Sequence, residues 1–202
     1  MKTCKLLREQ VAAATGSKKA ELVLKNAQIV NVFTQSVETG DIAIEGGYIV
    51  GIGNYEGITE KDLGGAYVCP GFLDGHIHIE SSMTSPGEFE RAVVPHGTIA
   101  VITDPHEIAN VAGTAGIRFM MQSAQKLDLD VYFMLPSCVP ATDLDESGAE
   151  LLARDLEPFY ADEKVLGLAE MMNAFGVTHG DKGCFEKLVQ ARSLKKAIDG
   201  HA

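Results

Sequence analysis

Two histidines separated by a single residue are the first feature of this sequence that could do chemistry. His76 and His78 flank Ile77, in a segment that begins with Pro70 and Gly71. On a β-strand, residues i and i+2 project from the same face, so both imidazoles would point the same way. Two neutral imidazoles on one face can hold a divalent metal ion. The alternative is an inert, hydrogen-bonded pair at the end of a strand.

The other candidate residues also come directly after short apolar runs. A carboxylate at Glu170 closes the run 165–169 and is followed by Met171. A buried carboxylate in such a setting is unfavourable by several kcal/mol unless a cation compensates it, which favours metal binding. The remaining polar groups at strand ends are Asp104, His106 and Glu107 after the run 98–103, and His201 after the run that begins at Ala197.

These runs belong to a regular alternation of strand and helix after Gly71. Predicted helices cover 85–94, 114–127, 148–157 and 185–196, and a capping box at Ser85–Glu88 predicts the start of the first. Five β-α units indicate an α/β fold with a parallel sheet or barrel, in which the carboxyl ends of the strands converge on one site. A complete (β/α)8 barrel needs eight units and about 250 residues. We therefore expect a partial TIM-type barrel of about five strands, truncated after strand five.

The first 68 residues have a different pattern. A short helix is predicted over 3–14, and the runs 22–24, 28–32, 41–44 and 48–52 are separated by turn residues, which predicts an antiparallel meander. The domains are therefore predicted to be 1–68 and 69–202.

Composition limits the partners and the compartment. The chain has 202 residues, 46% of them apolar, and a net charge of -11, which argues against nucleic acid as a partner. It has no apolar run of about 18 residues, so no membrane span is expected. Four scattered cysteines and a charged start without a signal peptide favour a cytoplasmic protein with free thiols. The open edge of an unclosed sheet predicts association, and we expect a homo-oligomer.

Several motifs resemble a known family. Pro70–His78 resembles the first-strand signature of the amidohydrolase superfamily, whose members are metal-dependent hydrolases on a (β/α)8 barrel. Four stretches resemble the adenine deaminase family within it: His78–Met83, Thr103–Val111, Gly167–Asn173 and Asp199–Ala202. The resemblance runs from about residue 20 to the end and implies that the N-terminal strands are part of a flanking β-sandwich.

The resemblance implies hydrolytic deamination of adenine, a purine base, to hypoxanthine and ammonia by a metal-activated hydroxide. The cofactor would be a binuclear Mn(II) or Fe(II) site. Its implied ligands are His76, His78, Glu170 as the bridging carboxylate and His201 for the second metal. From their places at the strand ends we expect Glu170, His106 and Glu107 to be catalytic and Asp104 and Glu80 to contact the substrate, although His106 and Glu107 could instead be a polar pair at the start of a helix.

Two elements of the family pattern lie outside this sequence: the histidine of strand six and the aspartate base of strand eight. We therefore expect the isolated chain to be inactive or nearly so. Two alternatives stay open: another amidohydrolase acting on a cyclic amide or an N-acetyl sugar, and a non-catalytic metal-binding or interaction module.

Overall fold

The computed structural model describes residues 3–142 and 144–200 and divides into two compact units, Met1–Pro70 and Gly71–Ala202. Each unit has its own sheet and its own apolar core. The domain boundary after residue 68 remains a prediction, because compactness alone does not define a folding domain. No helix among the described residues is both long enough and apolar enough to cross a membrane.

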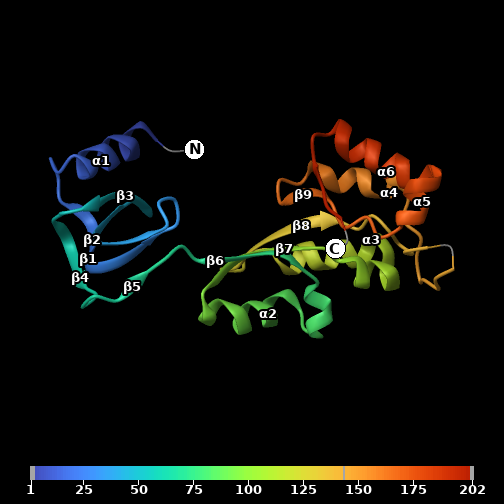
Figure 1. The fold of residues 1–202 in the computed structure, drawn as a ribbon, viewed down its shortest axis with the longest axis horizontal. Coiled ribbons are helices and arrows are strands. Elements are labelled where there is room, and N and C mark those ends of the chain that lie inside the picture. Colours follow the sequence, from blue (N-terminus) through green and yellow to red (C-terminus); the bar gives the residue numbers. More distant parts are fainter. Residues whose placement is uncertain (1–2, 143, 201–202) are drawn as a thin grey trace. The chain divides into compact units, whose positions relative to one another are not determined.

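The first unit consists of one helix and one five-stranded mixed sheet (Figure 1). Its strand order is β3-β2-β1-β4, with β5 also paired to β1. The helix α1 starts after Thr3, whose hydroxyl accepts a hydrogen bond from the Leu6 N–H at 3.3 Å. The elements are α1 (Cys4–Ala14), β1 (Ala20–Asn31), β2 (Ser36–Glu45), β3 (Tyr48–Gly53), β4 (Gly57–Asp62) and β5 (Tyr67–Val68).

The predicted antiparallel meander is wrong in one respect. The runs 22–24 and 28–32 were expected to be separate strands, but both lie within β1, whose pairing with β2 shifts register between Leu24 and Ala27. Asn26 adopts φ 57° there, a conformation that asparagine tolerates, and its N–H donates to the Asp41 carboxylate at 3.1 Å. The chain therefore bulges and continues instead of turning. The antiparallel pairing of β2 with β1 and β3 is as predicted, whereas β4 and β5, which lie outside the predicted runs, pair with β1 in parallel.

The second unit is a five-stranded parallel sheet with the order β10-β9-β8-β7-β6 (Figure 1). This confirms the predicted α/β class and the partial barrel. The strands are β6 (Phe72–Ile77), β7 (Thr98–Thr103), β8 (Asp130–Leu135), β9 (Val165–Leu168) and β10 (Ala197–Ile198). The α-helices are α2 (Pro86–Val93), α3 (His106–Ser123), α4 (Ala153–Leu156), α5 (Ala174–His179) and α6 (Lys182–Ser193), and the 3-10 helices are η1 (Ile79–Ser82), η2 (Val94–His96) and η3 (Glu157–Ala161).

The core of this unit lies between the sheet and the helices. Phe133 of β8 and Leu168 of β9 are buried together with Ile117 and Met120 of α3. Burying apolar side chains of this size contributes roughly 1.5–3 kcal/mol each. This packing fixes the carboxyl ends of the strands, where the candidate residues stand.

The predicted helices need three corrections. Ser85 does precede α2, but its side chain makes no capping hydrogen bond, and Glu88 contacts Arg91 instead at 3.2 Å. α3 starts at His106, not near residue 114, because the chain turns into helix directly after Pro105 and is kinked at Gly113. The helix expected over 148–157 is reduced to α4 followed by η3, since Pro158 interrupts regular α-helix formation.

Candidate metal centre

His76 and His78 stand at the carboxyl end of β6 with their rings nearly perpendicular to each other. Their Nε2 atoms are 3.2 Å apart, and each Nδ1 has a partner of its own. The Nδ1 of His78 lies 2.9 Å from the main-chain oxygen of Asp104, and the Nδ1 of His76 lies 3.1 Å from the Asp199 carboxylate. Because a carbonyl or carboxylate oxygen accepts, each Nδ1 carries the proton in the neutral ring, and each Nε2 is left with a lone pair. Two lone pairs that face each other at this distance favour a cation.

Glu170 brings a carboxylate to the same place from the end of β9. Its side chain is only 6% exposed, and its Oε1 lies 3.5 Å from the Nε2 of His78. Its Oε2 lies 3.9 Å from the Nε2 of His76. The sequence-based expectation that these three residues converge therefore agrees with their geometry.

Asp104 and His106 follow β7 and complete the group. Asp104 is 1% exposed, and its Oδ2 lies 3.0 Å from the Nδ1 of His106. Burial raises the pKa of the Asp104 carboxyl, and the His106 contact opposes that shift. The hydrogen bond to Asp104 in turn raises the pKa of His106, against the effect of burial. The second Asp104 oxygen, Oδ1, is buried without a hydrogen-bond partner among the described residues.

The residues fit a divalent cation by the nature of their donors. Ligand atoms of His78, Asp104, His106 and Glu170 all lie within 4.8 Å of one another. Two imidazoles and two carboxylates suit Zn, Fe or Mn, and a cation would compensate the two buried carboxylates, including the unpartnered Asp104 oxygen. The sequence interpretation placed Asp104 with the substrate and His106 in catalysis, whereas the structure adds both to the groups that could hold a metal ion.

The two remaining predicted residues stand next to this group, not within it. Glu80 accepts a hydrogen bond from the Ile108 N–H at 3.2 Å and so satisfies the start of α3, which has no side-chain cap at Pro105. Glu107 accepts a hydrogen bond from the Ser81 hydroxyl at 2.6 Å. Burial is the main cause that raises the pKa of Glu80. The carboxylates of Glu80 and Glu107 connect η1 to α3, and the roles predicted for them stay predictions. His201, the fourth predicted ligand, lies outside the described residues.

Sequence reasoning assigned no role to Asp199 or Ser137. Asp199 contacts His76, and its main-chain N–H donates to the Leu168 oxygen at 3.0 Å. The hydroxyl of Ser137 donates to the main-chain oxygen of Glu170. Their positions in the chain could have identified both residues, because each lies at the end of a predicted strand, as the other candidate residues do.

Comparisons with known proteins identify the family to which the chain belongs. The model of the amidohydrolase family matches residues 67–202, and the chain belongs to that family. Among solved structures, a dihydroorotase covers 91% of this chain and 51% of its own at 19% identity, with a TM-score of 0.56. An N-acyl-D-glutamate deacylase from Bordetella bronchiseptica, solved with zinc, covers 91% and 45% at 15% identity, with a TM-score of 0.60. At these identities the likeness concerns the fold alone.

Curated relatives are much closer in sequence. An adenine deaminase of Bacillus pumilus is 54% identical over 196 residues, which is 97% of this chain and 34% of the relative. An adenine deaminase of Geobacillus kaustophilus is 53% identical, and one of Bacillus subtilis is 50% identical; each match covers 96% of this chain and 34% of the relative. The chain thus spans about a third of the length of the curated relatives that it matches.

Proposed function

We propose that this chain carries part of the active site of an adenine deaminase, which hydrolyses adenine to hypoxanthine and ammonia. The observation that carries the proposal is the arrangement of His76 and His78, whose Nε2 atoms face the Glu170 carboxylate while their Nδ1 atoms are engaged elsewhere. The relatives named adenine deaminase support the substrate. Because the chain matches only a third of their length, the activity is proposed for a protein of that full length.

In this proposal His76, His78 and Glu170 hold a divalent cation, Mn(II) or Fe(II). Glu170 and His201 would also hold a second cation. A bound divalent cation lowers the pKa of water and so supplies hydroxide near neutral pH. The buried position of Glu170, with its carboxylate within 4 Å of the Nε2 atoms of His76 and His78, supports this role.

His106 handles protons at the substrate in this proposal. Its hydrogen bond to Asp104 raises its pKa, so the imidazolium persists to higher pH and can donate to a purine ring nitrogen or to the leaving amine. Asp104 orients the ring of His106 and contacts the substrate. Glu80 and Glu107 stand at the junction of η1 and α3, from which we propose that Glu80 contacts the base and Glu107 assists proton transfer.

The first test is the metal content of the 202-residue chain after anaerobic equilibration with Mn(II) or Fe(II). The parent chain should retain metal, and a His76→Ala, His78→Ala variant should lose it. His96→Ala removes an exposed histidine of η2 and serves as the matched control. A parent chain without bound metal would contradict the proposed centre.

A second measurement separates the role of His106 from that of a ligand. His106→Gln should keep the metal if His106 handles protons, and should lose it if His106 holds the cation. Ammonia release from adenine, compared with a panel of cyclic amides, then tests the substrate on a protein of the relatives' full length.

The proposal also has consequences for partners and compartment. The substrate is a free purine base, which would place the enzyme in purine salvage. All four cysteines are free thiols, which supports the reducing cytoplasm as the compartment. We further propose a homo-oligomer, and light scattering of the purified protein tests that assembly.

A further inference from the structure

Ser137 directly follows β8 and contacts the residue that brings the buried carboxylate to the candidate metal centre. The Ser137 side chain is buried, and its hydroxyl donates to the main-chain oxygen of Glu170 at 2.5 Å. A hydrogen bond to the main chain of Glu170 limits the rotation of its backbone. The direction in which the Glu170 side chain leaves the backbone is limited with it.

The neighbours of Glu170 are held from two sides. The Ala169 N–H donates to the Leu135 oxygen of β8 at 2.7 Å, and the Met171 N–H donates to the Asp199 oxygen at 3.3 Å. These bonds connect the segment to β8 on one side and to the residue that follows β10 on the other. The Ser137 hydroxyl, in contrast, holds the main chain of Glu170 itself.

Lys187 of α6 holds Ser137 in turn. Its ammonium donates to the main-chain oxygen of Ser137 at 2.7 Å, and the residue is only 7% exposed. Burial lowers the pKa of Lys187, and within the described chain no carboxylate lies within 4 Å of its Nζ. A buried ammonium is unfavourable unless it is hydrogen-bonded, and the Ser137 oxygen supplies such a hydrogen bond.

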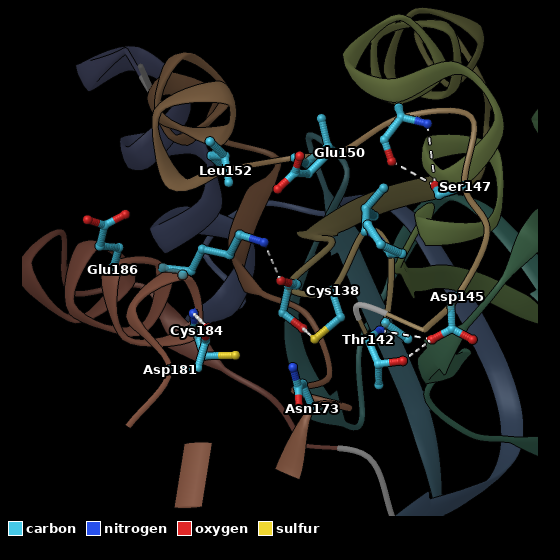
Figure 2. Close-up of a pocket in the computed structure, with 18 of the residues that line it drawn as sticks. Cys138, Thr142, Asp145, Ser147, Glu150, Leu152, Asn173, Asp181, Cys184 and Glu186 are labelled. Atoms are coloured by element: carbon cyan, nitrogen blue, oxygen red, sulfur yellow. Dashed lines mark hydrogen bonds between the residues drawn. The ribbon is translucent and has the colours of Figure 1, made fainter. Parts of the chain in front are cut away.

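A pocket lies beside the hydrogen bond between Lys187 and Ser137, so packing does not fix the loop after β8 on that side. A pocket of about 830 Å³ is lined by Ser137 and Lys187, and also by Cys138, Glu150 and Cys184 (Figure 2). Close packing normally fixes a buried loop, but on this side of Ser137 there is open space. On this side the hydrogen bonds of Ser137 hold the loop, whereas the following residues Cys138 and Val139 are buried.

We propose that Ser137 and Lys187 are positioning residues that hold the Glu170 carboxylate in the geometry needed for metal binding. This inference rests on the proposed function, because it assigns their effect to the same metal centre. The two residues act in series, since Lys187 holds Ser137 and Ser137 holds Glu170.

The test measures metal affinity of the 202-residue chain by titration with Mn(II). Ser137→Ala and Lys187→Met should each weaken binding about 10–100-fold, the range found when groups that orient metal ligands are removed. The double variant should bind Mn(II) only slightly less tightly than the single variant with the lower affinity. The reason is that the effects of two residues that act in series are not additive. Ser137→Thr retains a hydroxyl and should restore most of the affinity.

Two matched controls separate this effect from a general one. Lys182→Met changes an exposed lysine on the same helix, and Ser193→Ala removes an exposed hydroxyl from its last turn. Both controls should bind metal like the parent. Parent-like affinity in Ser137→Ala would overturn the inference, and this variant removes one oxygen atom only, so it carries the test if Lys187→Met does not fold.

Hydrogen exchange of the metal-free chain tests the positioning role of Ser137 and Lys187 independently of metal binding, and so independently of the proposed function. Amides of residues 169–171 should exchange faster in both variants than in the parent, and amides of β6 should not change. A parent chain that binds no metal would contradict the proposed function, and the exchange data would then decide whether Ser137 and Lys187 hold Glu170 at all. Unchanged exchange rates of the amides of 169–171 would contradict the proposal that Ser137 and Lys187 restrain the main chain at Glu170.

Discussion

His76 and Asp199 come from opposite edges of a five-stranded sheet, yet the Nδ1 of His76 lies 3.1 Å from the Asp199 carboxylate. His76 belongs to β6, the first edge strand, and Asp199 follows β10, the last. In a flat sheet, neighbouring strands are about 4.8 Å apart, which would separate these edges by roughly 19 Å. The sheet therefore curls strongly at the carboxyl ends of its strands, as a barrel wall does. The candidate metal centre lies inside that curve.

Removal of Asp199 should weaken metal binding. Its carboxylate accepts from the Nδ1 of His76 and so keeps the Nε2 lone pair available. Asp199→Ala should weaken Mn(II) binding about 10–100-fold in a calorimetric titration. Asp128→Ala changes an exposed aspartate before β8 and should have no effect. Equal affinities of the two variants would contradict the role of Asp199.

The hydrogen bond between Asp104 and His106 predicts a change in the titration of His106. That bond is the largest cause that raises the pKa of His106, so Asp104→Asn should lower this pKa in the metal-free chain. Histidine ring signals followed by NMR against pH measure it, and Asp128→Asn should leave the curve unchanged. An unchanged curve in Asp104→Asn would show that another group sets the pKa.

The same bond makes stability depend on pH in a defined direction. A histidine whose pKa is raised in the folded state contributes stability that is complete below its unfolded pKa of about 6.5. That contribution is lost as the pH rises through the higher, folded pKa. The free energy of unfolding attributable to His106 should therefore fall across this window, and Asp104→Asn should reduce the fall.

Asp41 should stabilise the first unit at neutral pH. Its side chain is buried, accepts from the Lys25 ammonium and from the Asn26 N–H, and these bonds lower its pKa, with the Lys25 bond the largest cause. Asp41→Ala should lower the free energy of unfolding by about 2 kcal/mol in urea at pH 7. The parent should lose this contribution only as the pH falls below about 3.9 and through the lower folded pKa. Glu56→Gln affects an exposed pair with Lys19 and should change stability by less than about 0.5 kcal/mol.

The kink in α3 should not tolerate a side chain. Gly113 adopts φ 56° and ψ -140°, and an added Cβ would lie 3.1 Å from the Ala149 Cβ. Gly113→Ala should therefore lower the free energy of unfolding by roughly 1–3 kcal/mol. Gly87→Ala in α2 meets only an ordinary contact with Leu127 at 4.0 Å and should be neutral or slightly stabilising. Thermal unfolding of both variants measures the difference.

The sequence by itself determined the features that depend on local order. The i, i+2 spacing of His76 and His78 predicted a candidate metal-binding pair, and the alternation of apolar runs with helices predicted the parallel sheet, because side-chain periodicity is a local property. The family resemblance added the substrate. Local pattern could not reveal that β1 continues through Asn26, because a bulge depends on the partner strand that receives it.

Only the tertiary structure decided which polar groups meet. Asp199 reaches His76 across 123 positions, and Ser137 reaches Glu170 across 33, because the strand order and the curl of the sheet bring their ends together. Asp104 and His106 join the group of possible ligands for the same reason, while Glu80 and Glu107 are occupied by the junction of η1 and α3. Contacts of this kind follow from register and packing over the whole unit, which no short stretch of sequence contains.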